Sequence, residues 1–200
     1  MKTLARGALV CLALLMAGCG VLPKKTETAI YTPLPTIQPD PAWPSTTRQL
    51  VVMRPSAARL IDSARILVRP VPGELQVYAG AVWLQPAPDM LQDTVVRLLE
   101  DSGKTAGVMR RGGGIAGEYD LVMDIRRFDA DYAEGSMPAA VIEVSASLVR
   151  GEQNQVAAHR LFRASTPATS TAIPDVSRAF ERSLAEVSGQ IAGWSLREMR

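Results

Sequence analysis

The group with the clearest chemistry in this 200-residue sequence is the thiol of Cys19, because of what precedes it. A basic start leads into an uncharged apolar run over residues 8–17, and the small residues Ala17 and Gly18 come directly before the cysteine. The run is too short to cross a bilayer, which takes about 20 apolar residues, and is typical of a secretory signal with its cleavage site. We therefore predict that residues 1–18 are a signal peptide, cut before Cys19.

Cleavage would also remove Cys11, so Cys19 would be the only cysteine of the mature chain. A single thiol in an oxidising compartment has no disulfide partner. The arrangement Leu15-Met16-Ala17-Gly18-Cys19 resembles the bacterial lipobox, except that Met16 stands where leucine is usual. The resemblance implies that Cys19 is acylated and becomes the first residue; the alternative is an ordinary secretory signal with an incidental cysteine. Several acyl chains would anchor the protein stably, since each buried methylene contributes about 0.8 kcal/mol.

The residue after the cysteine, Gly20, bears on which membrane holds the anchor. In the familiar sorting scheme for bacterial lipoproteins, aspartate at this position retains the protein at the inner membrane. The absence of aspartate after Cys19 implies transfer to the outer membrane. We therefore expect a lipid-anchored protein on the periplasmic face of the outer membrane.

The mature chain offers few groups for catalysis. Its one histidine, His159, lies in a predicted strand beside Arg160 with no nucleophile motif nearby, so we expect a surface histidine rather than a general base or metal ligand. A group of five acidic residues could suggest paired carboxylates, but Arg126 and Arg127 lie among them and favour a solvated strand face. The five are Asp120, Asp124, Asp129, Asp131 and Glu134.

Glycines 112, 114 and 117 form a G-x-G-x-x-G pattern. This pattern binds phosphates where a strand precedes it and a helix follows, but here a strand is predicted to follow, and no P-loop lysine–serine pair occurs. We interpret it as a surface loop. Together these observations predict a protein that is not an enzyme and that holds no cofactor or metal.

Charge gives no sign of an electrostatic partner. The signal peptide contains Lys2 and Arg6, so its removal lowers Lys+Arg from 22 to 20, equal to the 20 of Asp+Glu. A neutral mature chain argues against nucleic acid, which calls for a basic surface. The predicted lipid on Cys19 is therefore the membrane attachment that the sequence indicates.

Residues 19–46 are predicted to be a lipidated tether, because they are rich in proline and show no sustained apolar periodicity. Proline favours extended backbone, so the tether should be semi-stiff and lift the domain tens of ångströms from the bilayer, at about 3 Å per residue. An apolar island at residues 30–34 is expected to dock on the domain or on a partner.

Residues 47–200 suit a single domain. We predict an α/β (α+β) fold in which two main helices pack on a mixed, largely antiparallel sheet, in the order β-β-β-α-β-β-β-β-α. The helices are placed from Asp89 to Gly103 and over 176–194, where apolar residues recur every three or four positions. The strands are placed at 50–53, 64–69, 74–78, 105–109, 119–128, 141–149 and 156–164, with a hairpin turn at Pro72-Gly73.

One segment carries a family resemblance. Leu75, Tyr78, Trp83, Pro86 and Leu91 form the pattern L-x2-Y-x4-W-x2-P-x4-L. With Tyr31-Thr32-Pro33-Leu34, the strand start Tyr119-Asp120-Leu121 and a last helix ending at Trp194, it resembles the ABC-type transport auxiliary lipoprotein family, which includes the lipoprotein of the paraquat-inducible operon. We expect Tyr78 and Trp83 to pack in the core, with Trp83 at the seam between sheet and helix.

The resemblance implies a periplasmic domain, anchored in the outer membrane, that works beside an MCE-domain protein and an ABC transporter in moving lipids between membranes. A ring-like oligomer is known in a relative, so a homo-oligomer is a further expectation. The alternatives are a lipoprotein that activates or scaffolds a cell-wall synthesis enzyme, and a lipid carrier with its own cavity or an enzyme acting on the lipid.

Overall fold

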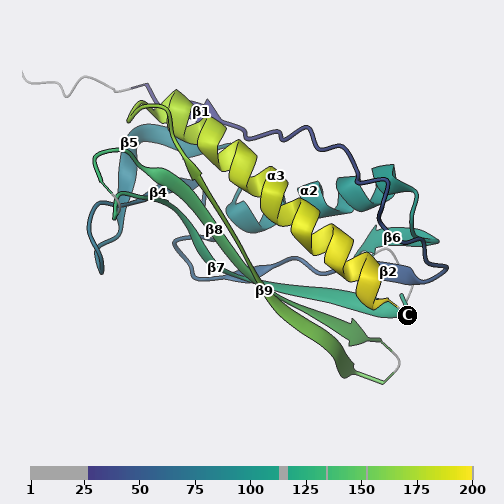
Figure 1. Cartoon of the computed structure of the whole chain (residues 1–200). Helices are drawn as coiled ribbons and strands as arrows, with labels where there is room; N and C mark the ends of the chain where they lie inside the picture. The colour runs from purple at the N-terminus through teal and green to yellow at the C-terminus, as the bar shows by residue number, and fades with distance from the viewer. Residues whose placement is uncertain (1–26, 113–116, 134, 152, 200) are drawn as a thin grey trace, which may run out of the picture.

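The computed structural model describes residues 27–112, 117–133, 135–151 and 153–199, which form one mixed sheet with two helices packed against it (Figure 1). The predicted fold class and the order of the main elements are confirmed, and two short strands, β1 and β3, are additional. The elements are β1 Ala29–Tyr31, β2 Gln49–Val52, β3 Ser56–Ala57, β4 Arg65–Arg69, β5 Gln76–Trp83, α2 Ala87–Ser102, β6 Gly107–Arg110, β7 Tyr119–Asp131, β8 Ala139–Arg150, β9 Gln155–Pro167 and α3 Ile173–Glu198.

The strand β7 is the spine of the sheet. Along one edge it pairs antiparallel with β8 over its whole length, and along the other it pairs parallel with β2, β3 and β4 in succession. β8 continues to β9, and β4 forms the predicted antiparallel hairpin with β5. The short strands β6 and β1 add parallel edges to β2 and β5.

A bulge in β7 changes which residues face the helices. Leu121, Met123 and Ile125 alternate inward as predicted, but the pairing with β8 shifts between Ile125 and Arg127. Beyond the shift, Phe128 and Ala130 are the buried apolar residues. A bulge adds one residue to a strand without changing its composition, so simple alternation does not reveal it.

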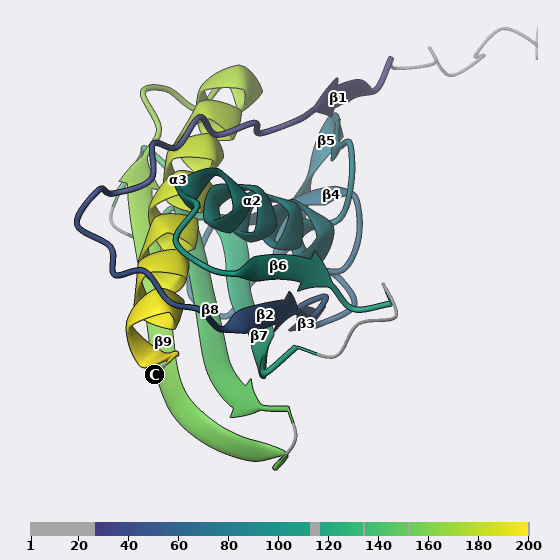
Figure 2. The ribbon, with the colours of Figure 1, turned by 90° about the vertical axis from the view of Figure 1, so that its right-hand side faces the viewer.

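The last helix supplies the longest apolar surface. The predicted stripe of Val176, Phe180, Leu184, Val187, Ile191 and Trp194 is buried along its whole length. Pro174 stands in the first turn, where a missing N–H costs no helical hydrogen bond. α3 lies across β8 and β9 and also contacts α2 (Figures 1 and 2), so the two helices share one face of the sheet. Within the described residues, neither helix is both long and apolar enough to span a membrane.

An aromatic cluster joins the sheet to α3. Trp83, at the end of β5, makes edge contacts with Phe128 of β7 and Phe180 of α3, at ring-centroid distances of 6.2 and 5.2 Å. Phe128 and Phe180 stack at 5.0 Å. The expected place of Trp83 at the sheet–helix seam is confirmed, although β5 reaches further than the predicted strand 74–78.

We predict that Trp83→Ala lowers the free energy of unfolding by about 3–5 kcal/mol, because it removes a buried indole from this cluster and leaves a cavity. The neighbouring Leu84→Ala is the matched control: Leu84 is 63% exposed, so its change should stay within about 0.5 kcal/mol. Chemical denaturation of both variants measures the difference. Equal stabilities would show that the cluster does not hold the seam.

Candidate functional site

The lipidation site predicted at Cys19 lies outside the described residues, so its acylation stays a prediction. The other groups with possible chemistry can be located, except Glu134, which is also outside. His159 is exposed on β9, as expected, and its Nε2 lies 2.9 Å from the Ser145 hydroxyl oxygen on β8. Across the described part of the chain, no three His, Cys, Asp or Glu side chains are grouped so that they could hold a metal.

The acidic residues of β7 pair with different partners rather than with one another. Asp120 forms an ion pair with Arg111 at 3.2 Å, and Asp124 accepts a hydrogen bond from the Ser56 hydroxyl at 2.8 Å. These two residues lie on the outer strand face, as predicted. No pair of facing carboxylates results, so acid–base chemistry of the glycosidase type has no basis in these residues.

Asp129 differs from the predicted solvated face. Its side chain is only 3% exposed, and it accepts hydrogen bonds from Arg127 at 2.6 Å and Arg69 at 3.3 Å. Arg127 also bonds Asp131 at 2.6 Å. The Arg69, Arg127 and Asp131 side chains are 13–26% exposed, so these two guanidinium and two carboxylate groups form a partly buried structural network around Asp129.

The glycine pattern is also structural where it is described. Gly112 has a φ of 113°, which suits glycine, and the next element is the strand β7, as predicted. A Cβ on Gly117 would lie 2.8 Å from Cγ2 of Val51, so this position must be glycine for the chain to pass β2. Residues 113–116 lie outside the described part.

The main difference from the sequence analysis concerns residues 29–46, which we call the strap. Rather than lifting the domain as part of the predicted semi-stiff tether, they run extended along the helical side of the domain (Figures 1 and 2). β1 begins the strap by pairing with β5, and the N–H of Leu84 donates to the Tyr31 carbonyl at 2.8 Å. From 31 to 39, alternate residues turn inward; these are Tyr31, Pro33, Pro35, Ile37 and Pro39.

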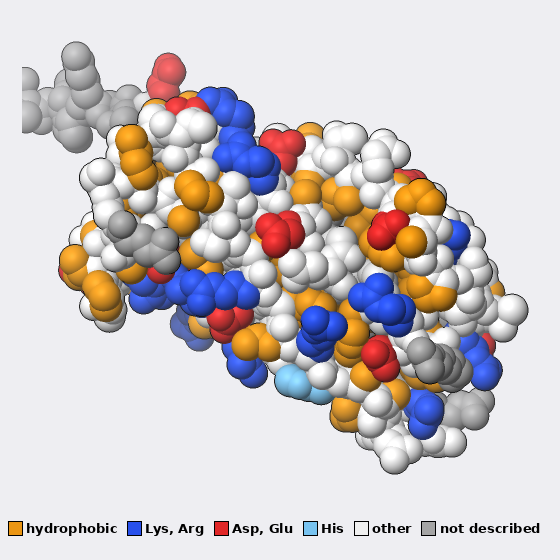
Figure 3. Space-filling view, in the orientation of Figure 1, with side chains coloured by type: hydrophobic (Ala, Val, Ile, Leu, Met, Phe, Trp, Pro, Cys, Tyr) orange, Lys and Arg blue, Asp and Glu red, His pale blue; other side chains and the backbone are white. Residues whose placement is uncertain are grey.

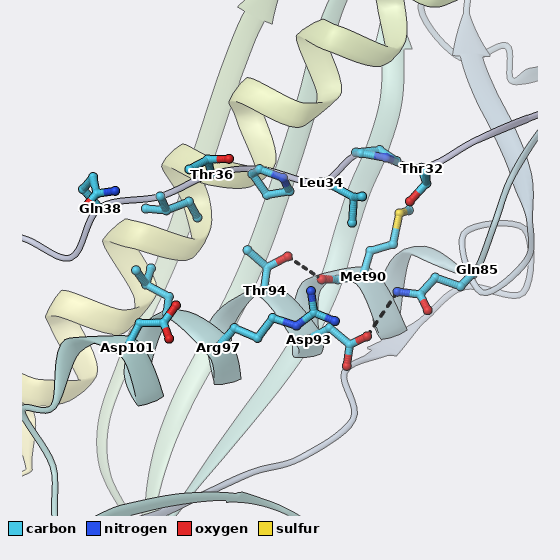
Figure 4. Close-up of a pocket in the computed structure, with 14 residues that line it drawn as sticks. Thr32, Leu34, Thr36, Gln38, Gln85, Met90, Asp93, Thr94, Arg97 and Asp101 are labelled. Atoms are coloured by element: carbon cyan, nitrogen blue, oxygen red, sulfur yellow. Dashed lines mark hydrogen bonds between the residues drawn. The ribbon is translucent and has the colours of Figure 1, made fainter.

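A cavity of about 440 Å³ lies between the strap and α2 (Figure 4). Its floor on α2 combines Met90 and Leu98 with Asp93, Thr94 and Arg97. A smaller hollow of about 280 Å³ lies on the other side, between the strap and α3. The strap therefore crosses the two helices with open space on both flanks.

Polar groups anchor the α2 wall of this cavity. The Thr94 hydroxyl donates to the Met90 carbonyl at 2.7 Å, and Gln85 donates to Asp93 at 3.3 Å (Figure 4). Asp93 also pairs with Arg110 of β6 at 2.8 Å. These bonds hold the wall in place and leave no carboxylate pair poised for proton transfer.

The far end of the strap is latched to the end of α3. The Trp43 indole lies over Gly193, where a Cβ would come within 2.6 Å of its Nε1. The Thr46 hydroxyl donates to the Met199 carbonyl at 3.1 Å, and the Thr46 N–H donates to the Lys104 carbonyl at 2.8 Å. Glycine in a helix normally weakens it, so Gly193 is explained by the close approach of the indole.

The docking of residues 35–46 was not predicted, because the proline content suggested a semi-stiff spacer. The signal was present in the two-residue alternation of Tyr31, Pro33, Pro35 and Ile37, which places one side of an extended chain against a surface. The apolar island predicted at 30–34 is part of this strap. The island was expected to dock on the domain or on a partner, and in the structure it docks on the domain.

The chain matches a known protein family over most of its length. The family model for the ABC-type transport auxiliary lipoprotein component matches residues 30–192, from the strap to α3. The chain belongs to this family. The family's description is a lipoprotein component auxiliary to ABC-type transport, which indicates a membrane-associated, periplasmic location.

Solved structures and a curated relative agree with the family fold. Protein XCC0632 from Xanthomonas campestris is 50% identical, with a TM-score of 0.83 over 86% of this chain and 96% of that chain. An uncharacterized protein of known structure has a TM-score of 0.64 at 17% identity, over 83% of this chain and 97% of that chain, and so shares the fold. The uncharacterized protein bll6063 of Bradyrhizobium diazoefficiens is 24% identical over 181 residues, which are 90% of this chain and 47% of that protein, so this chain spans about half of that relative.

We predict that Gly193→Ala loosens the strap, because the added methyl group displaces the Trp43 indole. The control is Gly189→Ala on the same helix, where a Cβ meets nothing within 4 Å and the helix should gain up to about 1 kcal/mol. In chemical denaturation, the free energy of unfolding of Gly193→Ala should be about 1–3 kcal/mol lower than that of Gly189→Ala. It should also be cut faster within the strap in limited proteolysis; identical stability and cleavage would contradict the latch.

The network of Arg127, Asp129 and Asp131 should make the stability of the domain depend on pH in the acid range. Burial alone would raise the pKa of Asp131, but hydrogen bonds from Arg127 and the Ala133 N–H hold that pKa below its ordinary value of 3.8. A lowered folded-state pKa contributes stability that is complete above the unfolded value and lost as the pH falls through the folded value. The free energy of unfolding should therefore hold from pH 7 to about pH 5 and decline below about pH 4.

Replacing Arg127 tests whether this network causes the loss of stability in acid. Arg127→Met should cost about 3–5 kcal/mol at pH 7, since it leaves Asp129 buried with a single partner, and it should reduce the acid decline. The decline should not vanish, because the pKa of Asp62 is also lowered, mainly by its hydrogen bond with Arg54. Arg111→Met, at an exposed pair, is the control; an unchanged acid profile in Arg127→Met would refute the assignment.

Proposed function

We propose that this protein is a non-enzymatic auxiliary component of an MCE/ABC-type system that moves lipids between membranes. Acylated Cys19 anchors it on the periplasmic face of the outer membrane, and the folded domain meets its partners in the periplasm. The observation that carries the proposal is the family match over residues 30–192, which includes the strap leading from the predicted anchor.

The groups along the chain support a binding role. Each described carboxylate on β7 bonds an arginine or a serine. His159 is exposed beside Ser145, and no third group among the described residues orients it as in a catalytic triad. The cavity beside the strap is lined by both apolar and charged side chains and holds no nucleophile–base pair. Such a surface suits docking of a partner or of part of a lipid.

Partner identification tests the proposal. The full chain is crosslinked in cells of its own organism, purified from membranes, and its partners identified by mass spectrometry. We expect an MCE-domain protein and an ABC permease, encoded beside this chain. Recovery of a cell-wall synthesis enzyme alone would favour the activator function instead, and light scattering of the purified protein reports whether it forms a homo-oligomer.

The anchor has its own test. Cys19→Ala should remove the acylation site, so the protein should be soluble in the periplasm or accumulate uncleaved, whereas wild type should fractionate with the outer membrane and carry the mass of its acyl chains. Cys11→Ala is the matched control and should behave as wild type, since Cys11 lies within the predicted signal. Processed, membrane-bound Cys19→Ala protein would contradict the anchoring.

A further inference from the structure

One end of the domain gathers the turns nearest the predicted anchor. The β4–β5 hairpin turn and the segment that joins β7 to β8 meet there, because Arg69 pairs with Asp131 in the sheet. The Tyr132 N–H donates to the Arg69 carbonyl at 3.0 Å, and the hydroxyl oxygens of Tyr78 and Tyr132 lie 3.4 Å apart. We call this the exit end, because β1, near which the described chain begins, lies on this side (Figure 1).

Four large apolar side chains are uncovered at the exit end. Val71 and Leu75 lie in the hairpin turn, Val77 follows in β5, and Met137 lies just before β8; each is 37–52% exposed. Figure 3 shows hydrophobic side chains along this end of the molecule. We call these four residues the apolar rim. Exposed apolar residues gathered on turns, rather than scattered singly, mark a contact surface.

Two of the described charges beside the rim are paired. Arg69 bonds Asp129 and Asp131 bonds Arg127, and the Arg69 and Asp131 side chains are partly buried. Glu74 is the exposed charged residue within the hairpin turn, where it bonds the neighbouring Gln76 side chain. Apolar tips beside tyrosines match the composition of protein surfaces that sit at the boundary of a bilayer.

The direction of the strap brings this end toward the membrane. β1 runs parallel to β5, with Ala29 beside Ala81, so the start of the strap lies on the strand that follows the hairpin turn. Cys19 lies ten positions before Ala29, and a fully extended chain over ten steps reaches about 35 Å. A lipid on Cys19 therefore holds the exit end, rather than the far end of the β8–β9 hairpin, close to the bilayer.

We propose that the apolar rim of Val71, Leu75, Val77 and Met137 seats in the interfacial region of the bilayer that carries the anchor. The partner is a lipid surface, because the short covalent connection places one beside the rim whenever Cys19 is acylated. The contact orients the domain, with the rim on the membrane and the β8–β9 hairpin tip in the periplasm. This inference rests on the anchoring proposed above.

The test places a polarity-sensitive fluorophore at single introduced cysteines of the mature lipidated protein. Val71→Cys and Met137→Cys probe the rim, and Val156→Cys, 58% exposed near the β8–β9 turn, is the matched control at the opposite end. The acylated Cys19 has no free thiol, so wild type should take no label. Each protein is reconstituted in vesicles of phosphatidylethanolamine and phosphatidylglycerol, with or without phosphatidylcholine brominated on its acyl chains.

In vesicles, the emission maximum of the labels at positions 71 and 137 should move to shorter wavelength, and brominated lipid should quench their fluorescence. The label at position 156 should show neither change. If all three labels behave like the one at Val156 while wild type takes no label, the rim inference fails and the anchoring stands. Labelling of wild type would mean free Cys19 and would overturn both. A shift that appears in detergent without lipid and rises with protein concentration would mean that a second copy covers the rim, which also overturns the inference.

Discussion

The apolar stripe of α3 against the sheet is the contact on which the other parts depend. Phe180 reaches the centre of that contact, where it stacks on Phe128 and meets Trp83. Because α3 is long and also contacts α2, its position sets the shape of the groove between the helices. The strap runs over both helices, with Trp43 on Gly193 of α3, so the packing of the core and the route of the strap are parts of one arrangement.

The strap changes what an N-terminal lipid can do. A linker that reached from Cys19 to Thr46 would let the domain move about 90 Å from the membrane, whereas docking of the strap limits the reach to the ten steps of chain from Cys19 to Ala29. Strand pairing at β1 holds one end, and Trp43 over Gly193 holds the other. A docked strap would therefore shorten the attachment to the membrane and determine which end of the domain faces it. An auxiliary component that must present one surface to a transport complex would benefit from both.

Much of the fold could be predicted from periodicity, because α3 and the strands β7–β9 each bury one continuous face. The bulge after Ile125 could not, since the residue that it adds is ordinary in composition, and for that reason Asp129 was placed in solvent rather than between two arginines. The strap was missed because proline is common both in linkers and in extended segments that dock on a surface. The family resemblance was carried by the segment around Trp83, which lies at the aromatic seam. The role of Cys19 rests on sequence alone.

The central claim is that the docked strap holds the domain close to the membrane. Neutron reflectometry of the lipidated protein on a supported bilayer measures this height directly. We predict that protein density begins within about 35 Å of the headgroups, because the pairing of β1 with β5 limits the reach to the ten steps of chain from Cys19 to Ala29. A wild-type domain separated from the bilayer by a wide water layer, at the reach of a free 19–46 linker, would contradict it.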